Sequence, residues 1–305
     1  MGTTLTEASL LQRSGRRADD NTPAATIDGI GQRKSQRRIV ASTRGRTHGP
    51  VTRVVSPADI GKLIKPFVFL DYFDFEPRGG AMFPMHPHSG IATLTILLSG
   101  RMSYEDTTGA SGHLAEGGLE WMRASGGVWH DASPTGSGRF HGYQLWVALP
   151  PQLENGRAES QYLPPEAVPQ VGPARVVLGT FGHANSPVHA PSGINVLHVR
   201  LEDGERWSYQ PGPDQTVAWT HVNTGELDVA GQHLRNEIAV FEESNGRLDF
   251  RAHGDTDFIV ASAVKHPHDL VLGHYSVHTN SYALQQGELE IARIGQGLRA
   301  RRRIP

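Results

Sequence analysis

The sequence predicts an all-β protein that contains two similar β-barrels. Short apolar runs alternate with turn residues at intervals of about ten residues, which is typical of sandwiches and barrels. The 35 glycines and 20 prolines supply the turns between these runs. The second half of the chain also repeats features of the first, and 305 residues are enough for two domains of about 150 residues each.

The composition excludes several classes of function. Hydrophobic residues make up 37% of the chain and charged residues 20%, as in ordinary folded proteins. With a formal net charge of −2, there is no electrostatic argument for direct binding to nucleic acid. Cysteine is absent, which excludes disulfides and thiolate chemistry and fits a cytoplasmic location. No apolar run resembles a membrane span or a secretory signal, so we expect no membrane association.

Three parts are predicted along the chain. Residues 1–38 carry seven Arg and Lys side chains without apolar periodicity, which predicts a disordered basic tail. Acidic residues interrupt this tail and argue against a targeting or nucleic-acid-binding segment. We expect an N-terminal barrel domain with the site at 39–165 and a C-terminal barrel domain at 166–305. A Pro- and Gly-rich connector is predicted at 152–175.

Short strands are predicted in both barrels. They are residues 38–40, 67–73, 91–98, 102–106, 119–122 and 143–147 in the first block, and residues 194–201, 216–222, 226–229, 238–241 and 258–260 in the second. A short C-terminal helical segment follows, with Asn280 or Ser281 as its cap. Gly287 falls inside its apolar pattern and weakens this prediction.

The chemistry of the chain centres on three histidines. His86 and His88 lie two residues apart at the start of an apolar strand, so their side chains share one face, about 6.6 Å apart along the backbone. His130 follows the turn Gly126-Gly127, which can bring a third imidazole in from a neighbouring strand. Three neutral imidazoles form a metal site that leaves positions open for water, O2 or a substrate. The alternative is a vestigial site that holds no metal.

The spacing of these residues matches the two metal motifs of the cupin barrel. Gly80, the HxH pair and Gly100 correspond to the first motif, and residues 117–130 to the second. By analogy with facial-triad sites we expect one divalent ion, Fe(II) first, although Zn, Ni, Cu or Co also suit three histidines.

The second half of the chain lacks an equivalent histidine pair. The repeated elements are residues 112–114 followed by 119–122 in the first copy and residues 232–234 followed by 238–241 in the second. A turn glycine precedes each copy, at Gly100 and Gly225 respectively. In this register Pro211 and Pro213 occupy the positions of the HxH pair, so we expect one active and one structural barrel.

Three sequence blocks resemble the signature blocks of the pirin family. They are FPMHPHSG at 83–90, WMRASGGVWH at 121–130 and HGYQLWVALP at 141–150, and SVHTN at 276–280 matches the segment before the family's terminal helix. The resemblance covers roughly residues 38–298. It implies a bicupin with a mononuclear metal in its N-terminal barrel, bound here by His86, His88 and His130. Some members of the family oxidise flavonols such as quercetin, and others are iron-dependent transcriptional co-regulators.

The chain departs from the family at both acidic positions. The fourth ligand of pirins is a glutamate two residues after the third histidine, where this chain has Ala132. The general cupin glutamate is replaced by Ala92. Asp131 is a poor substitute, because neighbouring residues on a strand face opposite ways. An ion held by three neutral ligands keeps its full charge and favours an anionic ligand, but the site lacks a carboxylate that could serve as general base.

Two functions therefore remain open. The first is an enzyme of the quercetin 2,3-dioxygenase type that acts on a small aromatic flavonol. The second is a non-catalytic regulatory protein, with or without metal, that binds a protein partner, and the loss of the acidic ligand favours it. Whether the chain is an enzyme at all is left undecided by the residues.

Several other residues have plainer interpretations. His141 is either an outer partner of the site or a hydrogen-bonded strand histidine. The repeated HPH string at 265–268 is predicted to be a surface turn. Trp121, Trp129 and Trp146 line a pocket or, more commonly for strand aromatics, belong to the core.

Overall fold

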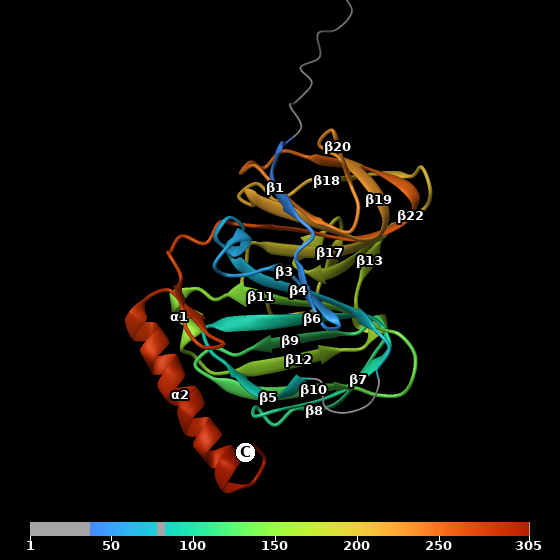
Figure 1. The fold of residues 1–305 in the computed structure, drawn as a ribbon. Helices are drawn as coiled ribbons and strands as arrows, with labels where there is room; N and C mark the ends of the chain where they lie inside the picture. Colours follow the sequence, from blue (N-terminus) through green and yellow to red (C-terminus); the bar gives the residue numbers. More distant parts are fainter. Residues whose placement is uncertain (1–36, 78–82, 305) are drawn as a thin grey trace, which may run out of the picture. The chain divides into compact units, whose positions relative to one another are not determined.

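The computed structural model describes residues 37–77 and 83–304, and the predicted all-β bicupin is confirmed. Every ladder between its named strands is antiparallel (Figure 1). The predicted tail lies outside the described residues, apart from Arg37 and Arg38. Arg37 is buried and donates hydrogen bonds to the carbonyls of Thr216 and Glu242, so these two residues belong to the structured part.

The first barrel consists of a seven-stranded and a four-stranded sheet. The larger sheet has the order β12 (Glu159–Leu163), β9 (Leu119–Arg123), β6 (Ile91–Ser99), β11 (Phe140–Ala148), β4 (Phe67–Phe75), β3 (Val51–Val55) and β2 (Arg46–His48). The smaller sheet has the order β5 (Phe83–His88), β10 (Val128–Pro134), β7 (Arg101–Asp106) and β8 (Ser111–Ala115). The polar side chains described below lie between these two sheets.

The second barrel is built from a nine-stranded sheet. Its main path is β1 (Ile39–Thr43), β21 (Ile238–Phe241), β19 (Val217–Val229), β22 (Leu248–Ala263), β17 (Ile194–Leu201), β14 (Ala174–Leu178) and β13 (Gln170–Val171), with β18 (Arg206–Tyr209) on β22 and β20 (Gln232–Leu234) on β19. The remaining elements are the pairs β15 (Thr180–Phe181) with β16 (Ala184–Asn185) and β23 (Val271–Leu272) with β24 (Val277–His278), the helices α1 (Pro151–Glu154) and α2 (Ser281–Ala300), and the 3-10 turns η1 (Ile60–Lys62) and η2 (Pro165–Ala167).

Two elements cross the predicted domain division at residue 165. Strand β1 precedes the first barrel in the chain but pairs with β21 of the second. Helix α2 ends the chain but packs on β5 and β10 of the first barrel, as Figure 1 shows. The division into 39–165 and 166–305 therefore stays a prediction. Strand β1 lies before the division and pairs with the second barrel, and helix α2 lies after it and packs on the first.

The predicted C-terminal helix is confirmed, and Asn280 is its cap. The Asn280 Oδ1 accepts a hydrogen bond from the Ala283 amide at 2.9 Å. Gly287 lies inside this helix. A Cβ at this position would lie 2.5 Å from both Ser89 Oγ and His278 Nε2, which explains why the residue is glycine. The glycine thus allows α2 to approach the turn that follows the HxH pair. Neither helix in the described part of the chain has the length and hydropathy that a bilayer span requires.

Two expectations about loops are wrong. The connector predicted at 152–175 contains β12, which is the edge strand of the first barrel and pairs with β9. The turn predicted at Gly225 is a register irregularity within the long strand β19. Gly225 has a φ of 75°, so it bends the strand without ending it, whereas Gly100 ends β6.

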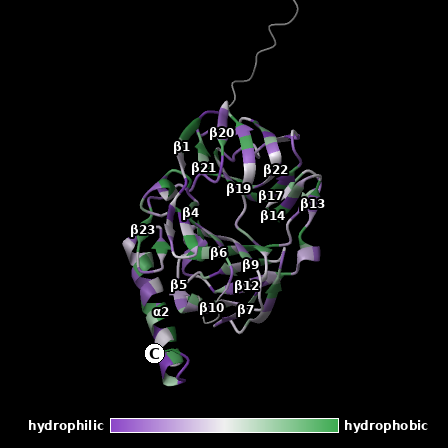
Figure 2. Ribbon diagram, turned by 45° about the vertical axis from the view of Figure 1, so that its right-hand side comes forward, coloured by the Kyte–Doolittle hydropathy of each residue, from purple (hydrophilic) through white to green (hydrophobic). Residues whose placement is uncertain are grey.

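An apolar cluster joins the two barrels. It combines residues of β6, β9 and β11 with residues of β17, β19 and β21, and Phe67 meets Trp219 edge to face with ring centroids 5.6 Å apart. Figure 2 shows hydrophobic residues along the strands and mixed character along α2. The outer face of the seven-stranded sheet is therefore used for packing, which leaves its inner face for the site.

Candidate metal centre

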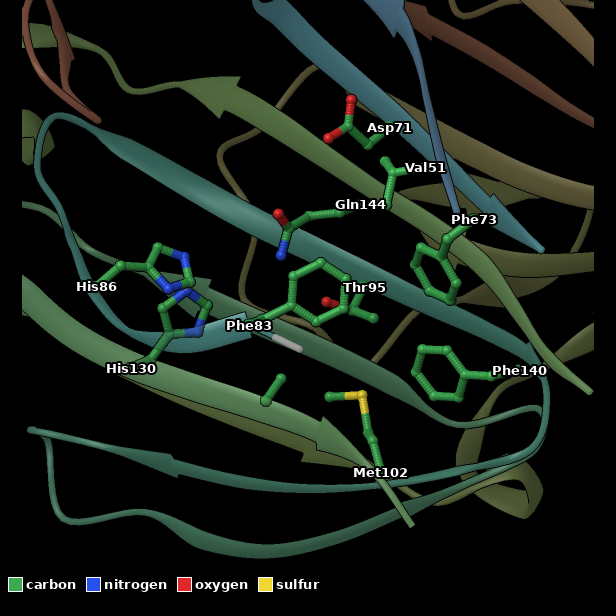
Figure 3. A pocket seen from close by; sticks show the side chains of 11 residues that line it. Val51, Asp71, Phe73, Phe83, His86, Thr95, Met102, His130, Phe140 and Gln144 are labelled. Atoms are coloured by element: carbon green, nitrogen blue, oxygen red, sulfur yellow. The ribbon is translucent and has the colours of Figure 1, made fainter. Parts of the chain in front are cut away.

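The structure brings the three predicted histidines together. Strands β5 and β10 pair with His86 opposite His130, and His88 lies on the same face as His86. One ligand atom of each ring lies within 4.8 Å of the others, and the Nε2 atoms of His86 and His130 are 3.1 Å apart. Figure 3 shows these two rings facing each other from their separate strands.

The outer nitrogen of each ring faces an oxygen atom. The Nδ1–H of His86 donates to the Pro84 carbonyl at 2.8 Å, and the Nδ1–H of His88 donates to the Tyr275 carbonyl at 3.0 Å. A carbonyl can only accept, so the Nε2 of both neutral rings carries a free lone pair. The Nδ1 of His130 faces Glu120 Oε1 at 3.6 Å. All three Nε2 atoms therefore point inward.

Burial keeps the HxH pair neutral. Burial first, and then the nearby His130, lowers the pKa of His86 to about 4, against the opposing effect of its bond to Pro84. Burial likewise holds the pKa of His88 well below its ordinary value. Neutral imidazole is the form that binds metals, so no proton has to leave these rings at neutral pH.

The donor set fits a divalent metal ion. The Nε2 of His88 is buried without a hydrogen-bond partner, which is costly for a polar atom that has no other role. Imidazole nitrogens lie about 2.0–2.1 Å from zinc, so two on one ion are at most about 4.2 Å apart, and His86 and His130 meet this limit.

A cavity of about 480 Å³ opens beside His86. It is lined by His48, Val51, Arg53, Phe69, Asp71, Phe83, Pro84, His86, Gln144, Trp146 and Tyr275. Trp146 stacks on Phe69 with centroids 4.1 Å apart and meets the His88 ring edge-on at 4.9 Å. The cavity thus has an aromatic wall next to the histidines, and Trp146 lines a pocket as well as belonging to the core.

Comparison with known proteins identifies the family. A family model described as Pirin matches residues 49–147. A protein of Pseudomonas aeruginosa named "Putative quercetin 2,3-dioxygenase" is 31% identical over 231 residues, which cover 70% of this chain and 80% of that protein. The chain belongs to the pirin family. The pirin of Homo sapiens is 30% identical over 182 residues, which cover 58% of this chain and 62% of the human protein.

Solved structures agree with the bicupin fold of this pirin. The quercetin 2,3-dioxygenase from Acinetobacter baumannii superposes with a TM-score of 0.78 at 21% identity, covering 85% of this chain and 97% of that chain. The bacterial pirin YhhW from Escherichia coli, solved in complex with nickel(II), gives a TM-score of 0.56 at 18% identity, covering 75% and 98%. At these identities the likeness shows the fold alone.

A small cavity lies at Ala132, where the resemblance to pirins predicts a glutamate ligand. Ala132 lines a small cavity of about 30 Å³ together with His86, His130 and Thr95. Asp131 is outside the histidine group and pairs across the ladder with Glu105. The alternation of strand side chains predicted this orientation correctly.

Sequence reasoning missed Glu120, a carboxylate behind His130. Its side chain is 1% exposed and lies on β9, between the buried Leu119 and Trp121. An isolated acidic residue inside an apolar strand is the signal that was available, because strand alternation turns it away from the apolar cluster of its neighbours.

Sequence reasoning also missed Tyr275, which comes from the far end of the chain. Its carbonyl orients His88, and its ring lies 5.6 Å from the His86 ring. Tyr275 has a φ of 59°, a left-handed conformation that is uncommon outside glycine, Asn and Asp. No local pattern could have indicated this contact, since 187 positions separate Tyr275 from His88.

The remaining histidines predicted to have plainer roles lie elsewhere. His141 is a hydrogen-bonded strand histidine at the junction of the barrels, 2.9 Å from Asn223 Oδ1. The HPH string at 265–268 is a loop outside the site, as expected, but His266 is buried instead of exposed and contacts the Leu149 carbonyl. Trp121 is core, and Trp129 donates a hydrogen bond to the Ile291 carbonyl of α2.

A second group of possible ligands is exposed on the second barrel. It consists of Asp228, His233 and His253. Both ring nitrogens of His233 contact carboxylates, Nδ1 that of Asp228 at 2.8 Å and Nε2 that of Glu226 at 2.9 Å. The Nε2 of His253 lies 2.6 Å from the second oxygen of Asp228. These atoms are satisfied by one another as surface ion pairs.

A third buried cluster has the order of a hydrolase triad but no room for a substrate. Ser89 Oγ lies 3.0 Å from His278 Nε2, and His278 Nδ1 lies 3.2 Å from Glu154. Gly287 of α2 closes over both Ser89 and His278. Glu154 also accepts two hydrogen bonds from Thr279, so the cluster anchors the C-terminal segment to the first barrel.

Proposed function

We propose that this pirin binds one divalent metal ion through the Nε2 atoms of His86, His88 and His130 and oxidises a flavonol-type aromatic substrate with O2. The convergence of three Nε2 atoms, each on a ring whose Nδ1 faces an oxygen, is the observation that supports this best. Such outer contacts fix the orientation and tautomer of metal-binding histidines.

We propose Fe(II) as the ion, and Zn(II), Ni(II), Cu(II) or Co(II) also suit three imidazoles. Bound Fe(II) would supply the redox chemistry that lets O2 react with an electron-rich substrate. The nickel(II) complex of the E. coli pirin concerns that protein and does not decide the metal here.

The cavity beside His86 suits a flat aromatic substrate. Trp146 and Phe69 form one wall, and the Tyr275 ring lies beside His86. Gln144 lines this cavity and also the small cavity of Figure 3, and its amide can orient a substrate hydroxyl or carbonyl.

Asp71 is the carboxylate available in this cavity as a proton acceptor for a substrate hydroxyl. Burial raises the pKa of Asp71, and its two hydrogen bonds from Arg53, at 2.7 and 3.1 Å, oppose this effect. Asp71 thus offers the general base that residue 132 lacks.

The test is to load the purified chain with Fe(II) under anaerobic conditions, quantify the metal and follow O2 uptake with quercetin. We expect one ion per chain and quercetin-dependent O2 uptake. His88→Ala should lower metal affinity by more than about 100-fold, beyond the usual effect of an outer partner, and abolish uptake. His253→Ala, in the surface group of the second barrel, is the matched control and should change neither. A chain that binds no metal would contradict the proposal.

The second candidate is a regulatory protein that binds metal without turnover and acts on a protein partner. Ala132 favours it, because the site lacks the acidic ligand of other pirins. A metal-loaded chain that consumes no O2 with any flavonol tried would remove the first candidate in that form. A cytoplasmic location stays a prediction for both.

A further inference from the structure

Glu120 is a buried carboxylate whose nearest basic group is a proposed metal ligand. Its Oε1 lies 3.6 Å from the Nδ1 of His130, and both side chains are 1% exposed. In the described residues, no arginine or lysine forms an ion pair with Glu120. Burying a carboxylate is costly unless a positive charge or hydrogen-bond donors lie beside it, and an ion bound to His130 would supply such a charge.

Hydroxyl groups hold Glu120 in this position. Thr95 donates a hydrogen bond to Oε2 at 2.5 Å, and the Tyr162 hydroxyl, at 3.3 Å from Oε1, shares its single proton between Glu120 and Asp106. Tyr162 also lies 3.1 Å from Asp106, a second buried carboxylate. Burial and these two carboxylates raise the pKa of Tyr162, so it stays a hydroxyl donor. The carboxylate is therefore fixed, and it cannot turn away from His130 without losing these bonds.

A neutral His130 cannot satisfy both of its neighbours. With its proton on Nε2, it presents the Nδ1 lone pair to a carboxylate. With its proton on Nδ1, it presents an Nε2 lone pair to that of His86, only 3.1 Å away. An ion between the Nε2 atoms would resolve both contacts, because the proton of His130 would then be on Nδ1 and directed at Glu120.

We propose that Glu120 is the positioning residue that supplies the negative charge of this metal centre, in place of the glutamate missing at position 132. The charge comes from β9 through the ring of His130, so it raises metal affinity without occupying a coordination position. This inference rests on the proposed metal site. It explains how the centre keeps one carboxylate while leaving room beside Ala132.

The experiment compares metal affinity among four variants by competition with a chromophoric chelator, using Zn(II) and Ni(II) as probes. Glu120→Gln keeps the shape but removes the charge, and its amide oxygen can still accept one of the two hydroxyl hydrogen bonds while its NH2 group donates to the other hydroxyl oxygen. We expect a 10- to 100-fold loss of affinity. Glu120→Asp keeps the charge and should bind with intermediate affinity. Glu120→Gln combined with Ala132→Glu should restore binding, because the carboxylate returns at the other position.

Glu154→Gln is the matched control. Glu154 is also buried and also faces an imidazole Nδ1, that of His278 at 3.2 Å, but His278 is outside the metal group. We expect it to lower the melting temperature without changing metal affinity. Glu120→Gln should lower metal affinity without lowering the melting temperature. The pair of variants thus separates a role in the charge of the site from a role in folding.

The outcomes distinguish the two proposals. If the wild-type chain binds one ion and Glu120→Gln and Glu120→Asp bind it equally well, the role of Glu120 is wrong and the metal site stands. A loss of affinity that Ala132→Glu does not restore would contradict the replacement of one carboxylate by the other. If the wild-type chain binds no Zn(II) or Ni(II), both proposals fail.

Discussion

On the inner face of the first barrel, strands β6, β9 and β11 carry Thr95, Glu120 and Gln144. In the core of the second barrel, strands β17 and β22 carry Leu197, Phe250 and Phe258. The same duplicated scaffold is thus lined with polar groups around a cavity in one copy and filled with apolar side chains in the other. A barrel without a site can be packed solidly, and the stability it provides offsets the polar interior of its neighbour.

The polar groups inside the two barrels also differ in how they are satisfied. In the second barrel, Tyr209, Ser262 and Asn195 form a continuous hydrogen-bonded chain, with Tyr209 OH 2.6 Å from Ser262 and 3.1 Å from Asn195. In the first, His88 Nε2 is buried without a hydrogen-bond partner, on a ring whose ligand atom lies within 4.8 Å of those of His86 and His130. A closed network stabilises a fold, whereas an unsatisfied nitrogen beside two further imidazoles favours a bound ligand.

The largest effect should come from removing packing in the second barrel. Phe258→Ala should lower the free energy of unfolding by about 3–5 kcal/mol, because it leaves a cavity in a fully buried core. Gln144→Ala in the first barrel should cost less than about 1 kcal/mol, since its side chain already borders a cavity, yet it should reduce substrate oxidation. Urea denaturation of both variants checks this. Equal losses of stability would contradict the contrast between a filled and a hollow barrel.

An intermediate effect is expected from the helix that covers only the first barrel. Gly287→Ala should destabilise the protein by about 1–3 kcal/mol, because the new methyl group would overlap Ser89 and His278. Gly297→Ala lies in the same helix with nothing within 4 Å of a Cβ, so it should stabilise by about 0.5–1 kcal/mol. Thermal melting of the pair measures the difference. Two changes of the same sign would show that α2 is not held closely against the barrel.

The smallest effect concerns the exposed ion pairs of the second barrel. Hydrogen bonds from His233 to Asp228, and then to Glu226, raise the pKa of His233. A raised pKa stabilises the folded state fully below the unfolded value of about 6.5, and this contribution disappears as the pH rises through the folded value. Because His233 is half exposed, the contribution should stay below about 1 kcal/mol. The difference in unfolding free energy between the wild type and His233→Gln should fall by this amount from pH 6 to pH 9, since the buried histidines, His86 among them, titrate alike in both proteins.

The strand pattern of the sequence was sufficient for the all-β duplicated fold, the shared face of His86 and His88, the outward position of Asp131 and a helix capped at Asn280 or Ser281. These properties depend on periodicity and on neighbours a few residues away, which a linear chain displays directly. Pairing across sheets is different, because it depends on which strands become neighbours after folding. Only the tertiary structure placed Glu120 behind His130, Tyr275 over His88, and β1 and α2 on the barrels farthest from them in sequence. The sequence alone therefore indicated which three histidines come together, and folding decided which carboxylate and which carbonyl face them, because those contacts join residues far apart in the chain.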